Sequence, residues 1–296
     1  MATNYTYKIE KAEVRVVHND KQYKILVSEL EFGQTFREAS FPVKTLHNQS
    51  SFEGSVINRA NPAEFSLNTA LPQQDDHKVI FDRLLDSATF DLYISTTQDV
   101  WKLETCVIQD GSFQINKSRP LRLTVNGEAS KLSKHSGTIP GTVQSVSDIT
   151  YIIPTLPAVT IGGTDISDSV VSIQAEIQND IEWNKNDTIH GVVTATDAAT
   201  SIYPTNFING TRIVGGSITR YYDKDAPDVL TWNTNTALRI RAGKKTDAAI
   251  YGVDFNITNC SFTNRLSTAD TFLEQNNWRM TQNPTALSSV ITYTTA

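Results

Sequence analysis

The sequence is poor in cysteine, in charge and in long apolar runs, and each shortage excludes a class of protein. Its two cysteines, Cys106 and Cys260, cannot build a disulfide framework or a four-ligand zinc site, so both are predicted to be reduced thiols. No run approaches the ~18 apolar residues of a membrane span, and the amino-terminal stretch lacks the apolar core of a secretory signal. We therefore expect the protein to be made and assembled in a reducing cytoplasm.

Charged residues make up only 20% of the chain, and the formal net charge is −6. This balance argues against a sequence-specific DNA reader, because basic side chains that neutralise phosphates supply much of such a protein's affinity. A mild acidic excess is compatible with a DNA conduit, which must not grip what passes through it.

Recognisable catalytic and metal-binding patterns are also missing. The five histidines share no spacing, and neither a His-Glu-x-x-His nor a Cys-x-x-Cys pattern occurs. Asp75-Asp76-His77 is the best local metal candidate, although acidic residues at the start of a helix are more typical of capping. Trp183 and Tyr221-Tyr222 could form a sugar platform, with a core or subunit-contact role as the alternative. We expect no enzymatic activity, no cofactor and no metal.

Alternation of apolar and polar residues dominates the chain and predicts β-strands, as in Val253, Phe255 and Ile257 with polar neighbours between them. The same alternation occurs around Phe90 and around Leu238. Further strands are expected at 12–17, 24–32, 50–57, 101–108, 112–116, 120–126, 168–178, 211–221 and 278–282. Four turns are expected between strands, at Asp110-Gly111, Asn126-Gly127, Gly162-Gly163 and Asn209-Gly210.

Helix is scarce in the predicted structure. An apolar stripe predicts a helix over 76–86, with Asp75 or Asp76 as its cap, and a shorter helix is expected near 268–275. Residues 133–158 are rich in Ser, Gly, Thr and Pro and read as a connection, in which Val143 to Ile153 could form an arm lying across a neighbour.

Short sequence pieces recur in the same order in the two halves, which indicates a duplicated domain. Ile108–Phe113 recurs as Ile257–Phe262, and Val27-Ser28 recurs as Val171-Ser172. The other two pairs are Gly54–Arg59 with Gly216–Arg220, and Leu121–Thr124 with Trp278–Thr281.

Arginines reappear inside the copied pieces: Arg59 matches Arg220, and Arg122 matches Arg279. A lone surface arginine is usually solvated, but one that recurs in both halves suggests an ion pair between domains or between subunits. These four arginines are our candidate subunit-contact residues.

With these recurring Gly-Ser-[Val/Ile]-x-x-Arg and Ile-x-[Asp/Asn]-x-Ser-Phe pieces, and with helix 76–86 set between strands, the chain resembles the tail tube proteins of long-tailed bacteriophages. The resemblance covers most of 5–135 and 159–290. It implies a mainly β fold of two tandem β-sandwich domains, each with at most one short flanking helix. The domains would be 1–135 and 159–296, joined by a linker at 136–158.

The resemblance also implies a function: a non-enzymatic virion protein, the major tail tube subunit, assembled in the host cytoplasm. Three duplicated chains would form a pseudo-hexameric ring whose inner strands build a ring-wide β-barrel, and stacked rings would conduct DNA during ejection. Partners would be copies of itself, a sheath if the tail contracts, and baseplate and terminator proteins. The polar loops 33–50 and 179–209 would mediate stacking.

Two alternatives stay open: a terminator, distal tail or baseplate ring protein of the same fold, or a carbohydrate-binding β-sandwich. For a tube, residues facing the lumen are expected to carry more Asp and Glu than Lys and Arg.

Overall fold

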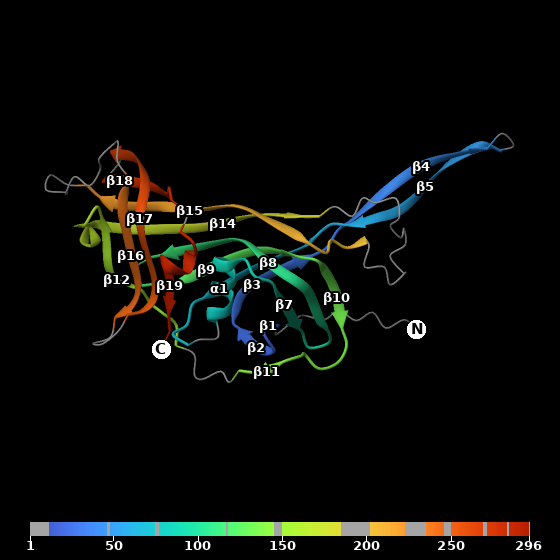
Figure 1. Ribbon diagram of the computed structural model, residues 1–296, viewed down its shortest axis with the longest axis horizontal. Coiled ribbons are helices and arrows are strands. Elements are labelled where there is room, and N and C mark those ends of the chain that lie inside the picture. Colours follow the sequence, from blue (N-terminus) through green and yellow to red (C-terminus); the bar gives the residue numbers. More distant parts are fainter. Residues whose placement is uncertain are drawn as a thin grey trace.

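The computed structural model describes residues 12–45, 48–74, 77–116, 118–144, 150–184, 202–222, 235–245, 250–268, 271–282 and 284–295. The protein is mainly β, as the sequence predicts. Its described strands form one large hydrogen-bonded sheet network and a separate two-stranded hairpin. Figure 1 shows this hairpin, β4–β5, projecting away from the rest of the chain.

Strands and helices of the first half and the connection are β1 (Glu13–His18), β2 (Lys21–Ile25), β3 (Val27–Gly33), β4 (Phe36–Thr45), β5 (Asn48–Ala60), β6 (Ala63–Ala70), α1 (Lys78–Asp86), β7 (Phe90–Ser95), β8 (Val100–Ile115), β9 (Arg122–Ala129), β10 (Lys131–His135) and β11 (Thr142–Val143). Those of the second half are β12 (Thr155–Ile161), β13 (Thr164–Asp165), η2 (Ser167–Ser169), β14 (Val170–Trp183), β15 (Phe207–Tyr221), β16 (Thr236–Lys245), β17 (Ile250–Thr268), β18 (Phe272–Met280), η4 (Leu287–Ser289) and β19 (Ile291–Thr294).

The two halves repeat one topology strand by strand. In the first half, one antiparallel sheet runs β2–β1–β7–β8–β10 and a second runs β3–β6–β9–β8, because the long strand β8 belongs to both. In the second half the same orders recur as β13–β12–β16–β17–β19 and β14–β15–β18–β17. A bulge even falls at the same place in β3 and β14, where Ser28 and Val171 are the extra residues.

The two halves share one core, which gathers around α1. The ring of Phe81 on α1 lies 5.8 Å from Phe113 of β8, and Phe113 lies 5.6 Å from Phe255 of β17. On its other side Phe81 lies 5.4 Å from Tyr293 of β19, whose hydroxyl donates a hydrogen bond to the Pro72 carbonyl oxygen. Helix α1 of the first half is therefore packed directly against the second half.

Polar side chains of the second half also donate hydrogen bonds to backbone carbonyl oxygens at the carboxyl end of α1, which lack partners within the helix. Arg212 of β15 donates from Nη1 to the Leu85 carbonyl oxygen at 2.7 Å, and from Nη2 to the Ser87 hydroxyl at 2.7 Å. Asn179 of β14 donates from Nδ2 to the carbonyl oxygens of Leu84 and Ile108. A cation at a helix carboxyl terminus also favours the helix dipole.

Helix 76–86 is confirmed, as α1 from Lys78 to Asp86, with its apolar stripe buried. His77 stands at the N-cap without a side-chain cap bond, and the predicted caps, Asp75 and Asp76, lie outside the described residues. The helix expected near 268–275 is wrong: β17 extends to Thr268 and β18 begins at Phe272. Strand β18 pairs on both sides, with β15 and β17, and this pairing overrides the local preference.

Of the four predicted turns, only Gly162-Gly163 is confirmed, with φ of 60° and 86°. Asp110-Gly111, Asn126-Gly127 and Asn209-Gly210 lie inside β8, β9 and β15. The glycine at 127 serves close packing: a Cβ there would lie 2.4 Å from Cζ of Phe65, its register partner on β6. Glycine inside a strand often marks such an approach rather than a turn.

The predicted connection and loops are more ordered than expected. Most of the predicted loop 33–50 lies in the β4–β5 hairpin, formed by residues 36–45 and 48–60, and β5 contains the strand predicted at 50–57. Strand β11 pairs in parallel with β2, and Ile152 is buried, with backbone hydrogen bonds to Leu71 and Leu121 of the same chain. The described part of the predicted arm, Val143–Gln144 and Thr150–Ile153, therefore contacts its own molecule, and 145–149 lie outside the described residues.

Candidate subunit edges and polar sheet face

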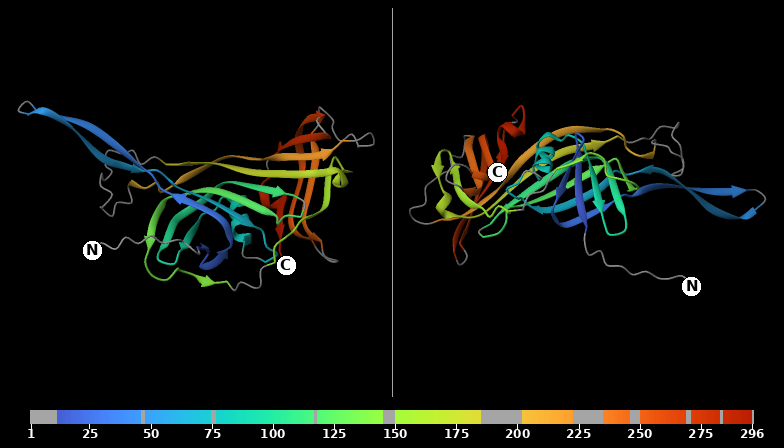
Figure 2. Two further views of the ribbon diagram at one scale, coloured as in Figure 1. Left: turned by 180° about the vertical axis from the view of Figure 1, so that it is seen from behind. Right: turned by 90° about the horizontal axis from the view of Figure 1, so that it is seen from below.

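One strand pair joins the two halves into a continuous sheet. The end of β8 pairs with the start of β14, with Ile115 opposite Ile173, Gln114 opposite Gln174, and Phe113 opposite Ala175. The resulting antiparallel sheet runs β3–β6–β9–β8–β14–β15–β18–β17. Figures 1 and 2 show the long β14–β15 pair beside the first half, and the end of β8 pairs with β14.

Each end of this sheet is an open edge within the part of the chain that the structure describes. Strand β3 pairs with β6 on one side, and the end of β17 (261–268) pairs with β18 on one side. Because β3 is the counterpart of β14, and β17 of β8, these two edges are the same two edges that meet inside the chain at β8–β14. Unpaired edges present backbone donors and acceptors that another strand can bind.

Exposure along the edges agrees with a missing neighbour. The strand pairing leads from Thr69 through Leu123 to Phe113 in the first half, and from its counterpart Arg220 through Glu274 to Leu266 in the second. Phe113 and Leu266 therefore hold equivalent places. Phe113 is 1% exposed where β14 covers it, whereas Leu266 is 50% exposed.

One face of the eight-stranded sheet is mainly polar, with Ile213, Tyr221 and Leu273 among its exceptions on β15 and β18. Alternate residues of each strand point to it, and the opposite alternates enter the core. Its acidic side chains are Glu29, Glu31, Glu64, Asp110, Glu128, Glu176, Asp180 and Glu182, and its basic ones are Arg122, Arg265 and Arg279. The face is therefore acidic and wet along most of its length.

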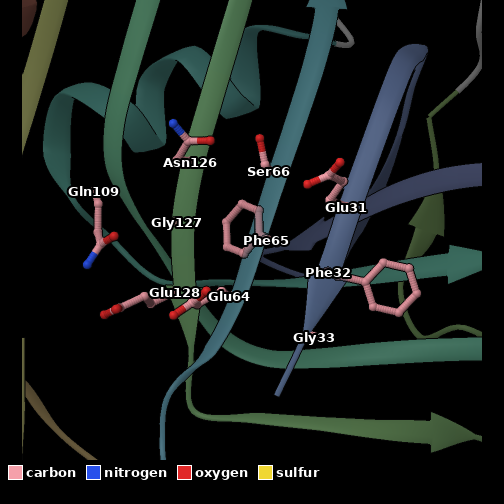
Figure 3. A pocket seen from close by; sticks show the side chains of 10 residues that line it. All are labelled: Glu31, Phe32, Gly33, Glu64, Phe65, Ser66, Gln109, Asn126, Gly127 and Glu128. Atoms are coloured by element: carbon pink, nitrogen blue, oxygen red, sulfur yellow. The ribbon is translucent and has the colours of Figure 1, made fainter. Parts of the chain in front are cut away.

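A shallow hollow on this face collects three of the carboxylates (Figure 3). Glu64 and Glu128 are register partners on β6 and β9 and lie close together, while Glu31 comes from β3 at the sheet edge. Partial burial raises the pKa of Glu128, and the nearby Glu64 charge raises it further. Burial and the Glu176 charge raise the pKa of Asp110 in the same way. The negative charges of these carboxylates also make the surface repel other anions.

The four candidate arginines are not brought together. Arg122 and Arg279 are exposed on the polar face, on β9 and β18. Arg122 lies opposite Gln114, whereas Arg279 lies opposite Ser261, so their places in the two halves differ. Their role as subunit contacts stays a prediction.

Arg59 and Arg220 do not occupy equivalent places either. Arg59 lies in the β4–β5 hairpin, opposite Arg37, whereas the bulge register makes Thr69 of β6 the counterpart of Arg220. Arg220 is fully buried and forms an ion pair with Glu274 on β18 of the same chain. It is a core residue of the second half, which spacing along the sequence could not distinguish from a surface contact.

The other candidate sites predicted from the sequence find little geometric support. Trp183 contacts Phe207 with tilted rings at one end of the β14–β15 pair, and Tyr221 lies at the other end, so they form no common sugar platform. His77 is buried and accepts a hydrogen bond from the Leu26 backbone, and burial lowers its pKa to about 4. Among the described residues no three His, Cys, Asp or Glu side chains are placed so that together they could hold a metal ion.

Both cysteines are buried and free, and burial raises the pKa of the Cys260 thiol to about 12. No helix in the described ranges has the length and apolar character needed to cross a bilayer.

A search of curated proteins found no match to this sequence. Residues 5–295 match the model of the Bacteriophage Baseplate Tube Protein Family. The match spans nearly the whole chain and agrees with the β-rich fold of two like halves. The protein therefore belongs to this family and is a tail-related structural component of a phage virion.

Proposed function

We propose that the protein is a non-enzymatic wall subunit of the phage tail tube at the baseplate, and that three copies close a ring around a DNA-conducting lumen. The observation that supports this most directly is the β8–β14 pair inside the chain. It is a junction between two like units, and the chain carries the same two edges, unpaired, at its ends.

In the proposed ring, β17 of one copy pairs with β3 of the next as β8 pairs with β14. The register of the internal junction then sets Leu266 opposite Phe32, as Phe113 is opposite Ala175. An apolar pair would thus be buried at both kinds of junction, which removes the exposed leucine from water. The two domains, 1–135 and 159–296 with a linker at 136–158, would alternate around the ring.

The size of such a ring suits a DNA conduit. Eight strands from each of three chains give 24 strands. With strands about 4.8 Å apart and tilted by about 40°, they enclose a circle roughly 45–50 Å across between backbones. This leaves room for a DNA duplex inside the inward side chains.

The polar face of the sheet would line that lumen, because the other face is occupied by the core. Eight acidic side chains against three basic ones give it the acidic balance expected of a surface over which phosphates must slide. The family description favours a place at the baseplate over the long tube, and the ring proposal is the same for both.

The test is particle mass together with symmetry. Three chains of 32.8 kDa give a particle of about 98 kDa, and class averages by electron microscopy should show a ring with threefold symmetry. The variant Leu266→Asp should leave a folded monomer, because a carboxylate would enter the buried junction.

The matched control is Val143→Asp, at a side chain that is 59% exposed on β11 and away from both edges; it should still form rings. A wild-type chain that stays monomeric at high concentration, or Leu266→Asp rings, would refute the proposal. Uniform filaments of the wild type would assign it instead to the major tail tube.

A further inference from the structure

We infer that residues 6–9 of one chain bind across the end of the second half of the neighbouring chain; the inference rests on the proposed ring. Its model is a contact inside the chain, where residues 150–153, here called the strap, cross the ends of β6 and β9. The Ile152 amide donates to the Leu71 carbonyl oxygen at 3.0 Å, and the Ile152 carbonyl oxygen accepts from the Leu121 amide at 2.8 Å. All three of these side chains are fully buried.

The corresponding end of the second half lacks this cover among the residues that the structure describes. Strand pairing makes Tyr222 the counterpart of Leu71 and, likewise, Phe272 the counterpart of Leu121. The Tyr222 amide donates to the Phe272 carbonyl oxygen at 3.0 Å, and the two rings lie 5.1 Å apart. Phe272 is nevertheless 38% exposed, and no segment of the described ranges makes the bonds there that Ile152 makes in the first half.

The segment that corresponds to the strap follows from strand register. Strand β12 holds the place in the second half that β1 holds in the first, and Val159 is the counterpart of Val14, because they pair with corresponding residues of β16 and β7. Strand β12 carries one extra residue, in its bulge after Thr155. Counting back from the two valines, with this one residue allowed for, makes residues 6–9 the counterpart of the strap.

The two segments also agree in sequence. Residues 6–9 are Thr6-Tyr7-Lys8-Ile9, and the strap is Thr150-Tyr151-Ile152-Ile153, so three of the four positions are identical. Because register set this alignment, the identity is an independent observation. The one difference, Lys8 in place of Ile152, suits a more open site, since a lysine stem covers apolar surface while its ammonium stays in water. Residues 1–11 lie outside the described residues.

The direction of the strap determines which chain is bound. The strap leads into the second half but binds the first, so each such segment binds the half that precedes its own along the sheet. Residues 6–9 lead into the first half. In the proposed ring, the half that precedes it is the second half of the neighbouring chain, whose β17 meets its β3. Each junction between chains would then have a paired edge and a strap, as the junction within the chain has.

A proline at position 8 tests the contact, because it removes the amide that corresponds to the Ile152 amide. Lys8→Pro should raise the concentration needed for half-assembly of rings by about tenfold or more, because it leaves a carbonyl oxygen of the neighbour without its donor. Asn4→Pro, outside the segment, is the matched control and should assemble within about twofold of the wild type. Lys8→Ile, which copies the strap, should assemble at least as well as the wild type. Circular dichroism and the melting temperature of each variant verify that it folds.

Hydrogen exchange followed by mass spectrometry locates the contact. Peptides that contain Lys8 and Phe272 should become protected together when wild-type rings form, because both amides then enter hydrogen bonds across the junction. In rings of Lys8→Pro, formed at high concentration, the Phe272 peptide should remain as exposed to exchange as in the monomer.

The outcomes separate this contact from the ring itself. Wild-type rings whose Lys8 peptide exchanges as fast as in the monomer, or Lys8→Pro rings that assemble as readily as Asn4→Pro rings, overturn the contact and leave the ring intact. Protection of both peptides in the monomer would place the segment on its own chain and also overturn the inference. A wild-type chain that never assembles overturns both proposals.

Discussion

Removing one partner of the buried Arg220–Glu274 ion pair should destabilise the protein far more than removing a surface pair. The two residues are register partners on β15 and β18, and their side chains are 1% and 3% exposed. Arg220 donates from Nε to Oε2 of Glu274, while Oε1 of Glu274 accepts a hydrogen bond from Asn264 of β17. The guanidinium also lies 5.8 Å from the Tyr222 ring.

The magnitude follows from this burial. Truncating one partner of a buried pair strands the other charge in the core and costs about 3–5 kcal/mol. At about 2 °C per kcal/mol for a chain of this size, Arg220→Met or Glu274→Gln should lower Tm by roughly 6–10 °C. Replacing both residues by apolar ones, Arg220→Met with Glu274→Leu, removes the stranded charge and should cost about 1 kcal/mol or less.

Thermal unfolding followed by circular dichroism at one fixed protein concentration measures these effects. The matched control is Asp82→Asn, which breaks the Lys78–Asp82 pair on the surface of α1, where both side chains are more than a third exposed. That pair should be worth at most about 0.5 kcal/mol. The reasoning fails if Glu274→Gln costs no more than Asp82→Asn, or if the double variant costs as much as the two single ones added together.

Two further predictions concern packing and pH. Gly127→Ala should cost about 1–3 kcal/mol of unfolding free energy in a denaturant titration, because its Cβ would lie 2.4 Å from the Phe65 ring and 2.5 Å from the Val107 carbonyl oxygen. Gly33→Ala, where a Cβ meets nothing within 4 Å, should be close to neutral, and equal losses at both sites would contradict the packing argument. Burial lowers the pKa of His77 from 6.5 to about 4, so the unfolded chain takes up this proton first as pH falls. The His77 contribution is fully present above pH 6.5, and the wild type should lose roughly 3 kcal/mol more than His77→Gln between pH 6.5 and pH 4; parallel curves would exclude this role.

Periodicity along the sequence predicts local structure well where one face of an element is buried. The alternation in β7, β16 and β17 and the apolar stripe of α1 are each visible without any tertiary information. Glycine is harder to interpret, because the same residue serves turns and close contacts. Gly162-Gly163 forms a turn, whereas Gly127 sits in mid-strand against an aromatic ring that only the fold brings there.

The candidate site depends on register, which short recurring pieces do not determine. They correctly suggest that the chain contains two like halves, yet they match Arg220 with Arg59 when the strand pairing matches it with Thr69. The two free edges, β3 and the end of β17, lie outside most of the recurring pieces. Their correspondence to the internal junction emerges only from following the paired strands across the sheet.

Two copies of one topology within a chain allow junctions that are identical in backbone to differ in side chains. The β8–β14 junction is held by covalent connection and by Asn179 and Arg212, which bind the end of α1. A junction between separate chains has no such tether and must be found by diffusion, against the competing edges of other copies. Burial of Leu266, which is 50% exposed on the single chain, would add an apolar contribution at that junction only when the neighbouring edge is in place.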